Sequence, residues 1–148
     1  MPPAEFLFTA NDPFLNLLNT RPDAGDDRLR TNDDLIRWMD RAGLIRAGDQ
    51  PWRWNDKADP LLSRVKRLRE SVRQALDART RGEPIPPDLL AQLQRDAADA
   101  PASPSQVTRP EHLHALLARA ALELLRRDPS SVRCEPTPDG QLWTDRPV

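Results

Sequence analysis

The chain has 148 residues, enough for one domain that buries a core without the help of disulfides. Its formal net charge of -1 excludes a general attraction to nucleic acid or anionic membranes, so such binding would need a local patch. The single cysteine, Cys134, excludes an internal disulfide and fits a reducing compartment. The first residues lack the pattern of a signal peptide, and no stretch is long enough to cross a bilayer, so we expect a cytoplasmic protein.

The first residues predict a short strand followed by a short helix. Residues 5–8 have the apolar character of a strand. Pro13 suits the first turn of a helix, because the N–H that proline lacks would have no partner there, and residues 14–18 supply apolar side chains. Residues 19–22 include Asn, Thr and Pro, which are expected to end this helix.

A second helix is predicted from its capping residues. Thr31 and Asp34 have the spacing of a capping box, with aspartate in place of the usual glutamate. The helix continues through the apolar residues Leu35, Ile36, Trp38 and Met39. Gly43 is expected to end it, because glycine readily adopts the left-handed conformation that closes many helices. The loop that follows is expected to be anchored to the core by Trp52 and Trp54.

The longest predicted helix runs from about residue 60 to Thr80. Its apolar residues recur at helical spacing and form one stripe, made of Leu61, Val65, Leu68, Val72, Ala75 and Leu76. Gly82 and the prolines after it end this helix. Pro87 then opens a shorter helix whose leucines, Leu89, Leu90 and Leu93, are expected to face inward.

The last part of the chain predicts a linker, a buried helix and a hairpin. Residues 98–108 have the composition of a surface linker. Pro110 opens a helix that we expect to be central, because its apolar residues cover a wide arc: Leu113, Leu116, Leu117, Ala120, Ala121, Leu124 and Leu125. Residues 132–136 and 141–144 flank a Pro-Asp-Gly turn and predict a β-hairpin. The predicted fold is therefore mainly α, a multihelical single domain with a small C-terminal β-hairpin.

The residue types that usually carry catalysis or bind metals do not converge in this sequence. The carboxylate pairs at 26–27 and 33–34 are sequence neighbours that point apart, so we interpret them as loop-solvating and helix-capping groups. His112 and His114 are two residues apart, which on a helix prevents them from sharing a metal. No nucleophile elbow, phosphate-binding glycine loop or dinucleotide fingerprint occurs. We predict no enzyme, no cofactor and no bound metal.

The helix over residues 61–81 is basic. Seven Lys and Arg residues against two acidic residues give 7 − 2 = +5. We interpret it as an ordinary amphipathic helix whose cations flank the apolar stripe and meet solvent. The alternative is direct nucleic-acid binding through Arg67, Arg69 and Arg73, with an affinity that falls steeply with salt.

Two stretches of the sequence carry a more specific pattern. Residues 13–21 read Pro-Phe-Leu-Asn-Leu-Leu-Asn-Thr-Arg, and residues 31–44 read Thr-Asn-Asp-Asp-Leu-Ile-Arg-Trp-Met-Asp-Arg-Ala-Gly-Leu. They resemble the opening of the ABATE domain, where an apolar segment ending in Asn-Thr precedes a helix of the form Asp-Leu-x-x-Trp-Leu-x-x-Ala-Gly-Leu. This domain occurs in bacterial proteins described as stress-induced transcription regulators. The helices at 61–81 and 111–125 follow in the family's order, so the resemblance implies an ABATE-like helical domain over residues 1–130.

In that family a zinc finger, named for a Cys-Gly-Asn-Arg motif, usually follows the domain and is the expected DNA-contacting part. Cys134 and the segment from Gly140 to Arg146 are similar to the start of such a finger. The resemblance thus implies a degenerate finger remnant at 131–148, which we expect as a hairpin packed on the helical domain. Asp139 stands in place of the second cysteine, so we expect no structural zinc. Either the finger was lost or the sequence was cut short, and Asp139 favours loss.

The resemblance implies a non-catalytic regulatory domain that senses a small-molecule effector or binds a protein partner, and a homo-oligomer is left open. We predict that a small molecule would bind where the first helix meets the second, with Asn16, Asn19 and Thr20 orienting it beside Trp38. Asn16 stands where the family commonly has Asp. The alternative is structural: Asn19 and Thr20 end the first helix and tie the next loop, and Trp38 belongs to the core.

Overall fold

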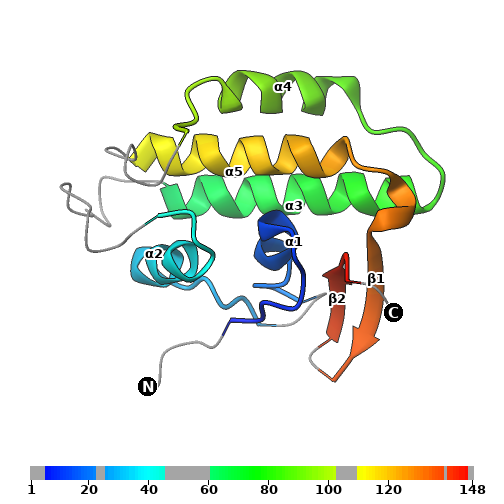
Figure 1. Ribbon diagram of the computed structural model, residues 1–148, viewed down its shortest axis with the longest axis horizontal. Coiled ribbons are helices and arrows are strands. Elements are labelled where there is room, and N and C mark those ends of the chain that lie inside the picture. The colour runs from blue at the N-terminus through cyan, green and yellow to red at the C-terminus, as the bar shows by residue number, and fades with distance from the viewer. Residues whose placement is uncertain (1–5, 23–25, 46–60, 103–109, 139, 147–148) are drawn as a thin grey trace.

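The computed structural model describes residues 6–22, 26–45, 61–102, 110–138 and 140–146. Within these residues the helices are α1 (Pro13–Leu18), α2 (Asn32–Arg41), α3 (Leu61–Thr80), α4 (Pro87–Ala97) and α5 (Pro110–Leu125) (Figure 1). The strands are β1 (Arg133–Thr137) and β2 (Gly140–Thr144), and a short 3-10 turn at Pro129–Ser131 lies between α5 and β1. The prediction of a mainly α fold with a C-terminal β-hairpin is confirmed.

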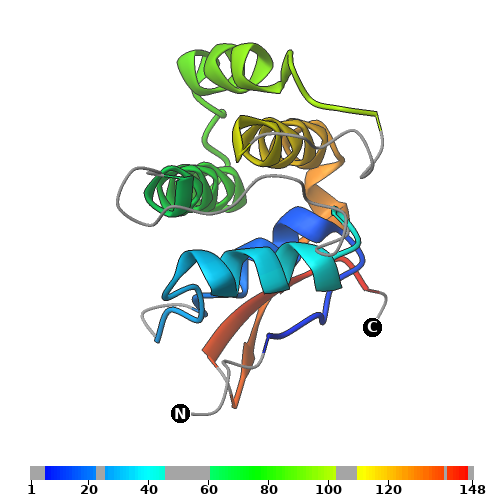
Figure 2. The same cartoon turned by 90° about the vertical axis from the view of Figure 1, so that its left-hand side faces the viewer.

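Helix α5 lies at the centre of the structure. Figure 2 shows α3, α4 and α5 nearly end-on as a group, with α1, α2 and the hairpin below them. α5 packs against α4, α3 and α1. The residues predicted to face the core are all buried, namely Leu113, Leu116, Leu117, Ala120, Ala121, Leu124 and Leu125. The prediction of a central buried helix is thus confirmed. Among the described residues, no helix combines the length and the apolar composition that a membrane crossing needs.

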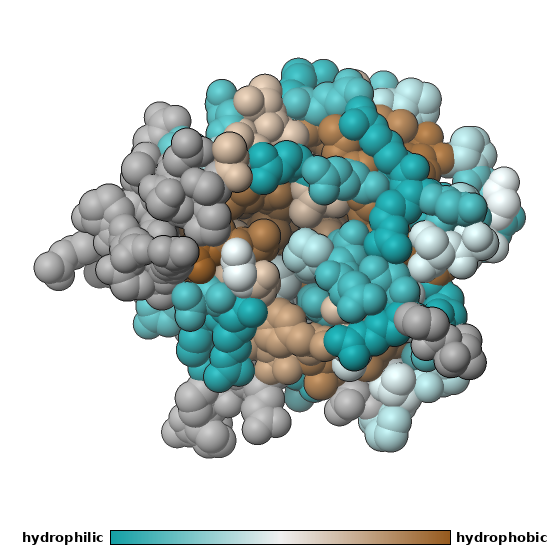
Figure 3. Space-filling model, in the orientation of Figure 1, coloured by the Kyte–Doolittle hydropathy of each residue, from teal (hydrophilic) through white to brown (hydrophobic). Residues whose placement is uncertain are grey.

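Helices α3 and α4 are both amphipathic, but they pack differently. The predicted apolar stripe of α3 is buried along its whole length. α4 buries Leu93 fully and packs chiefly on α5, with much less contact to α3. Leu89 and Leu90 stay half-buried. On the face shown in Figure 3, hydrophilic side chains cover much of α4 and hydrophobic surface shows beside it. The separation of α4 from α3 leaves the space in which the site described below is found.

Helix α2 begins and ends as its sequence predicts. Thr31 Oγ1 accepts a hydrogen bond from the Asp34 N–H at 3.1 Å, and Asp34 Oδ2 accepts one from the Thr31 N–H at 3.2 Å. These reciprocal bonds confirm the capping box. At the other end Gly43 has a φ of +77°, and the Leu44 N–H donates to the Met39 carbonyl at 3.0 Å. The left-handed residue closes the helix because glycine adopts this conformation without steric cost.

Replacement of Thr31 by alanine is expected to lower the free energy of unfolding by about 1 kcal/mol, because the Asp34 N–H loses its capping oxygen. Thr31→Ser keeps a hydroxyl at the same position and should retain most of that stability. Urea unfolding followed by far-ultraviolet circular dichroism measures both variants. Equal losses in the two variants would show that the capping oxygen is not the cause.

The hairpin is antiparallel, with a register that runs from Arg133 opposite Thr144 to Thr137 opposite Gly140. Its turn contacts the chain that follows α1. Gly140 has a φ of +114°, and a Cβ added there would lie 3.2 Å from Pro22 Cβ. The predicted hairpin is confirmed, and its turn uses glycine both for this conformation and for the close approach.

The predicted strand at residues 5–8 is wrong for its described part. Residues 6–8 form no strand, and the Phe8 carbonyl accepts a hydrogen bond from Arg146 Nη2 at 3.5 Å. The Asn16 amide pairs with both backbone groups of Ala10, and Phe8 packs against the core. Side chains thus bind the backbone of Phe8 and Ala10, where a strand would pair with a neighbouring strand.

Two predicted loops lie wholly or partly outside the described residues. The loop at 46–60, with Trp52 and Trp54, is one of them. Residues 103–108 of the predicted linker are another. The described part of that linker, residues 98–102, is irregular as predicted.

Candidate functional site

Asn16 and Asn19 use their side-chain amides to hold distant parts of the backbone against α1. Asn16 Nδ2 donates to the Ala10 carbonyl and Asn16 Oδ1 accepts from the Ala10 N–H, both at 3.0 Å. Asn19 Nδ2 donates to the carbonyl of Trp143 in β2, and Asn19 Oδ1 accepts from the Trp143 N–H, both at 2.8 Å. A carboxamide suits this role because it carries a donor and an acceptor side by side. The two residues fasten the N-terminal segment and the hairpin to α1.

Thr20 and Trp38 also contact the interior of the fold. Thr20 Oγ1 donates to the Leu17 carbonyl at 2.6 Å and accepts from Arg69 Nη1 at 3.0 Å. Trp38 is fully buried in α2 and stacks on Phe8, with ring centroids 6.1 Å apart and 14° between the rings. Its Nε1 has no hydrogen-bond partner within the described ranges. These contacts fit the structural alternative, and the ligand-binding role of the four predicted residues stays a prediction.

Arg69 of α3 is the centre of a buried ion-pair network. Its side chain is 1% exposed, and its Nη1 and Nη2 bind the two carboxylate oxygens of Asp27 at 2.9 and 2.7 Å. Its Nε donates to Glu70 Oε2 at 2.6 Å. Burial acts to raise the pKa of Asp27, but hydrogen bonds from Arg69 and the Leu29 N–H outweigh it and hold that pKa below its usual value. The network ties α3 to the loop between α1 and α2.

Arg73 and Arg67, the other arginines of the predicted nucleic-acid surface, differ in exposure. Arg73 Nη2 donates to the carbonyls of Leu18 and Arg21 at 2.6 and 2.8 Å, and its Nε donates to Glu70 Oε1 at 3.0 Å. Arg73 thus satisfies carbonyls at the end of α1. Arg67 is exposed. Of the three predicted contacts, Arg67 is the one whose side chain lies open to a phosphate in this conformation.

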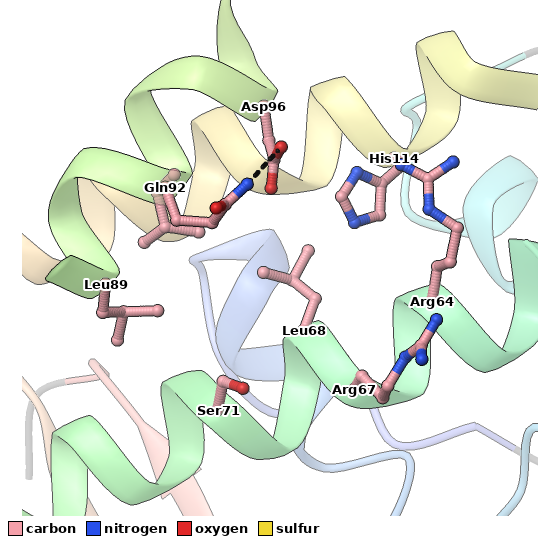
Figure 4. A pocket seen from close by; sticks show the side chains of 9 residues that line it. Arg64, Arg67, Leu68, Ser71, Leu89, Gln92, Asp96 and His114 are labelled. Atoms are coloured by element: carbon pink, nitrogen blue, oxygen red, sulfur yellow. Dashed lines mark hydrogen bonds between the residues drawn. The ribbon is translucent and has the colours of Figure 1, made fainter.

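A cavity of about 400 Å³ lies between α3 and α4, with α5 behind it (Figure 4). We call it the α3–α4 cavity. Its lining residues come from three helices: Arg64, Arg67, Leu68 and Ser71 from α3, Leu89, Gln92, Leu93 and Asp96 from α4, and His114 from α5. Small-molecule sites in proteins usually have volumes of roughly 300 to 1,000 Å³. A second hollow, of about 340 Å³, shares Ser71 and Leu89 with the cavity, so the two hollows adjoin each other along α3.

His114 is the buried polar group of the α3–α4 cavity. It is 8% exposed, and Figure 4 shows its ring pointing into the space between α4 and Arg64. Burial and the charge of Arg64 lower the pKa of His114 below 6.5, Arg67 adds to this effect, and Asp96 opposes it. The imidazole is therefore neutral near neutral pH and offers one N–H donor and one acceptor nitrogen.

Arg64 and Arg67 give the α3–α4 cavity two positive charges. Within the part of the chain that the structure describes, neither has a carboxylate partner, whereas Arg69 and Arg73 of the same helix both do. Asp96 lies across the cavity and accepts a hydrogen bond from Gln92 Nε2 at 2.9 Å (Figure 4). The cavity therefore combines cationic donors at the α3 wall with apolar leucine side chains.

The α3–α4 cavity also brings together a serine, a histidine and an aspartate. Catalytic triads of these residues depend on a serine–histidine and a histidine–aspartate hydrogen bond. In the described ranges Ser71 makes no such bond to His114, and the carboxylate of Asp96 is engaged by Gln92. The arrangement has the donors of a binding site without the proton relay of a hydrolase. No group of three or more potential metal ligands forms among the described residues either.

The sequence predicted a site at α1 and α2, whereas the α3–α4 cavity lies elsewhere and was not predicted. One signal was present for His114, which falls between Leu113 and Leu117 within the buried arc of α5. A polar residue inside such an arc needs a partner or a cavity. The sequence held no comparable signal for Arg64 and Arg67, because the position of α4 decides what they face.

Comparisons with known proteins give one match. Neither the curated proteins nor the solved structures contain a match to this chain. The sequence model of the ABATE family, described as "Putative stress-induced transcription regulator", matches residues 11–146. This match covers nearly all of the chain, from α1 through the hairpin, and confirms the resemblance seen in residues 13–21 and 31–44. The chain therefore belongs to the ABATE family.

Proposed function

We propose that this chain is a non-catalytic sensory domain of a transcription regulator and that its effector is a small molecule bound in the α3–α4 cavity. The observation that carries the proposal is the cavity itself, where Arg64, Arg67 and buried His114 converge above apolar side chains. Such a mixture of apolar walls with a few converging polar groups is typical of small-molecule sites. The family's description supports the regulatory role.

The packing of α4 suggests how a bound effector would be detected. α4 packs chiefly on α5 and faces α3 across the cavity. A ligand that contacts α3 and α4 together favours the conformations in which both helices reach it. The size of this population shift depends on how much more tightly the ligand binds these conformations than those in which only one helix reaches it. We propose that the restrained position of α4 is the signal passed on by the domain.

Thermal unfolding with a panel of neutral, cationic and anionic metabolites tests the proposal. At one hundred times its dissociation constant, a ligand of the folded state should add about 2.7 kcal/mol to the free energy of unfolding. Ser71→Trp places a bulky side chain in the cavity wall and should abolish the gain. Ser63→Trp is the matched control, because Ser63 is exposed on the same helix and does not line the cavity. Native mass spectrometry of the purified chain adds the subunit number and any retained small molecule.

The same experiment separates the cavity from the site first predicted on α1 and α2. A ligand whose effect survives Ser71→Trp but is lost in variants of Asn19 or Thr20 would support the earlier location. A panel in which no compound stabilises the chain would contradict the sensory proposal.

Nucleic-acid binding through the basic helix is the alternative function. Its structural support is Arg67, which is exposed and has no carboxylate partner among the described residues. Arg69 and Arg73 already bind inside the fold. If the alternative is correct, affinity for duplex DNA falls steeply with salt and Arg67→Glu weakens it further. A salt-independent affinity, or none, would exclude it.

A further inference from the structure

We propose that the effector carries a single oxyanion group, a carboxylate or a phosphate, that Arg64, Arg67 and His114 bind together, and an apolar body that lies on the leucines of the α3–α4 cavity. This inference rests on the proposed sensory function and names the chemical class of its ligand. It is carried by three groups that converge on one space from two helices (Figure 4).

The basic residues of α3 differ in whether an acidic side chain pairs with them. Lys66, Arg69 and Arg73 each lie within ion-pair distance of an acidic side chain, at 3.6 Å or less. Arg64 and Arg67 line the cavity without such a partner in the described part of the chain. They are three residues apart on the helix, so they lie on the same side of it. Two guanidinium groups that line one cavity attract an oxyanion, which accepts charge-assisted hydrogen bonds from both.

Buried His114 also favours an oxyanion in the α3–α4 cavity. More than nine-tenths of its surface is covered, it lines the cavity, and no side chain or backbone group among the described residues hydrogen-bonds to its ring. Its ring nitrogens remain accessible from the cavity, so a ligand oxygen can accept a hydrogen bond from the ring N–H without displacing a protein group. The imidazole thus supplies a third donor for the oxyanion.

The size and the walls of the α3–α4 cavity indicate what the rest of the ligand is. A cavity of about 400 Å³ is much larger than a carboxylate group, and Leu68, Leu89 and Leu93 contribute to its walls. Their burial by an apolar body adds affinity in proportion to the area covered. Asp96 on α4 disfavours a second anionic group on the ligand. The cavity therefore fits a ligand with one oxyanion group and an apolar body better than a ligand with several anionic groups.

If an anion binds beside His114, its affinity should depend on pH. The groups that face His114 are Arg64 and Arg67 on α3 and Asp96 on α4, and together with burial they keep its pKa low in the empty cavity. An anion beside the ring favours the imidazolium and raises that pKa, so binding takes up a proton. Affinity should therefore increase as the pH falls through the pKa of the complex and level off below the pKa of the free protein.

Calorimetric titration of the full chain with benzoate, phenyl phosphate and benzamide tests the inference. Benzoate and phenyl phosphate carry the two candidate oxyanions on the same apolar body, and benzamide is the neutral match. We expect one or both anions to bind, benzamide to bind at least about tenfold more weakly, and Arg64→Met or Arg67→Met to cost about tenfold or more. Arg126→Met is the matched control, because Arg126 is exposed and does not line the cavity.

The pH series supplies a result that a merely structural role of His114 would not give. Affinity for benzoate, which stays ionised over this range, should be higher at about pH 5.5 than at about pH 8, and His114→Gln should remove this dependence. Magnetic resonance of the two histidines should show the His114 signal titrating at higher pH with the anion present, and His112 provides the internal reference.

The outcomes separate this inference from the proposed function. If neither anion binds, or if both anions bind unchanged to Arg64→Met and Arg67→Met, the oxyanion inference is wrong. If a neutral compound then stabilises the wild-type chain but not Ser71→Trp, the sensory function still stands. If no compound of the panel stabilises the chain either, both proposals are wrong.

Discussion

Replacement of Arg69 by methionine is expected to lower the free energy of unfolding by about 3 to 5 kcal/mol, the usual cost of removing one partner of a buried ion pair. Arg69 is 1% exposed and binds both oxygens of Asp27, so its loss leaves a partly buried carboxylate without its main partner. Methionine fills much of the same volume, which limits the contribution of a cavity. Guanidinium chloride unfolding followed by tryptophan fluorescence measures the change.

The pH dependence of this loss identifies its cause. The pKa of Asp27 is depressed in the folded chain, so the carboxylate stabilises the fold above its unfolded pKa, and this stabilisation is lost as the pH falls through the folded value. The difference between wild type and Arg69→Met should therefore shrink in acid. Arg67→Met is the matched control, because Arg67 is exposed on the same helix, and it should change the free energy by less than about 0.5 kcal/mol. If the difference in free energy of unfolding between wild type and Arg69→Met stays constant down to strong acid, the ion-pair explanation is wrong.

Replacement of Asn19 by alanine is expected to cost about 2 to 4 kcal/mol, because it leaves two buried backbone groups of Trp143 without partners. Asn19 is 0% exposed, so water cannot replace the lost amide without disturbing the packing. The loss of local stability in Asn19→Ala should be largest in the hairpin. Hydrogen exchange of the β1 and β2 amides should accelerate more than exchange in α3 or α4.

Asn11→Ala is the control for that variant, because Asn11 is an exposed asparagine whose side chain has no role in this contact. It should leave both stability and hairpin exchange nearly unchanged. Uniform acceleration of exchange in Asn19→Ala would indicate global destabilisation rather than release of the hairpin. An Asn19→Ala variant that folds and keeps its affinity for an effector would exclude the predicted ligand role of Asn19.

Local patterns in the sequence predict much of this fold because local chemistry decides those features. Thr31 and Asp34 cap α2 through groups three residues apart, and Gly43 closes the helix through its own backbone conformation. The apolar spacing of α3 and α5 predicts which of their faces are buried. The hairpin follows from the turn that ends at Gly140. Each of these features depends on residues that are close in the chain.

The contacts missed by the sequence analysis are those between residues far apart in the chain. Arg69 lies one turn from Val65 and Val72, within the buried stripe, yet its charge suggested a solvent-facing residue. Only the position of Asp27 makes its burial favourable. The strand predicted at 5–8 failed for a similar reason, since its described part pairs with no strand and the distant Arg146 binds the Phe8 carbonyl. The α3–α4 cavity depends on how α4 sits on α5, which no local pattern encodes.

The pair of hydrogen bonds between Asn19 and Trp143 also has a consequence for biosynthesis. The two residues are 124 positions apart, and at roughly 5 to 20 residues per second the ribosome needs roughly 6 to 25 s to add that many. During this interval the Asn19 amide has no Trp143 to bind and must stay hydrated. We therefore expect the nascent chain to form α3, α4 and α5 before α1 reaches its final burial, with the hairpin completing the lower half of the molecule last.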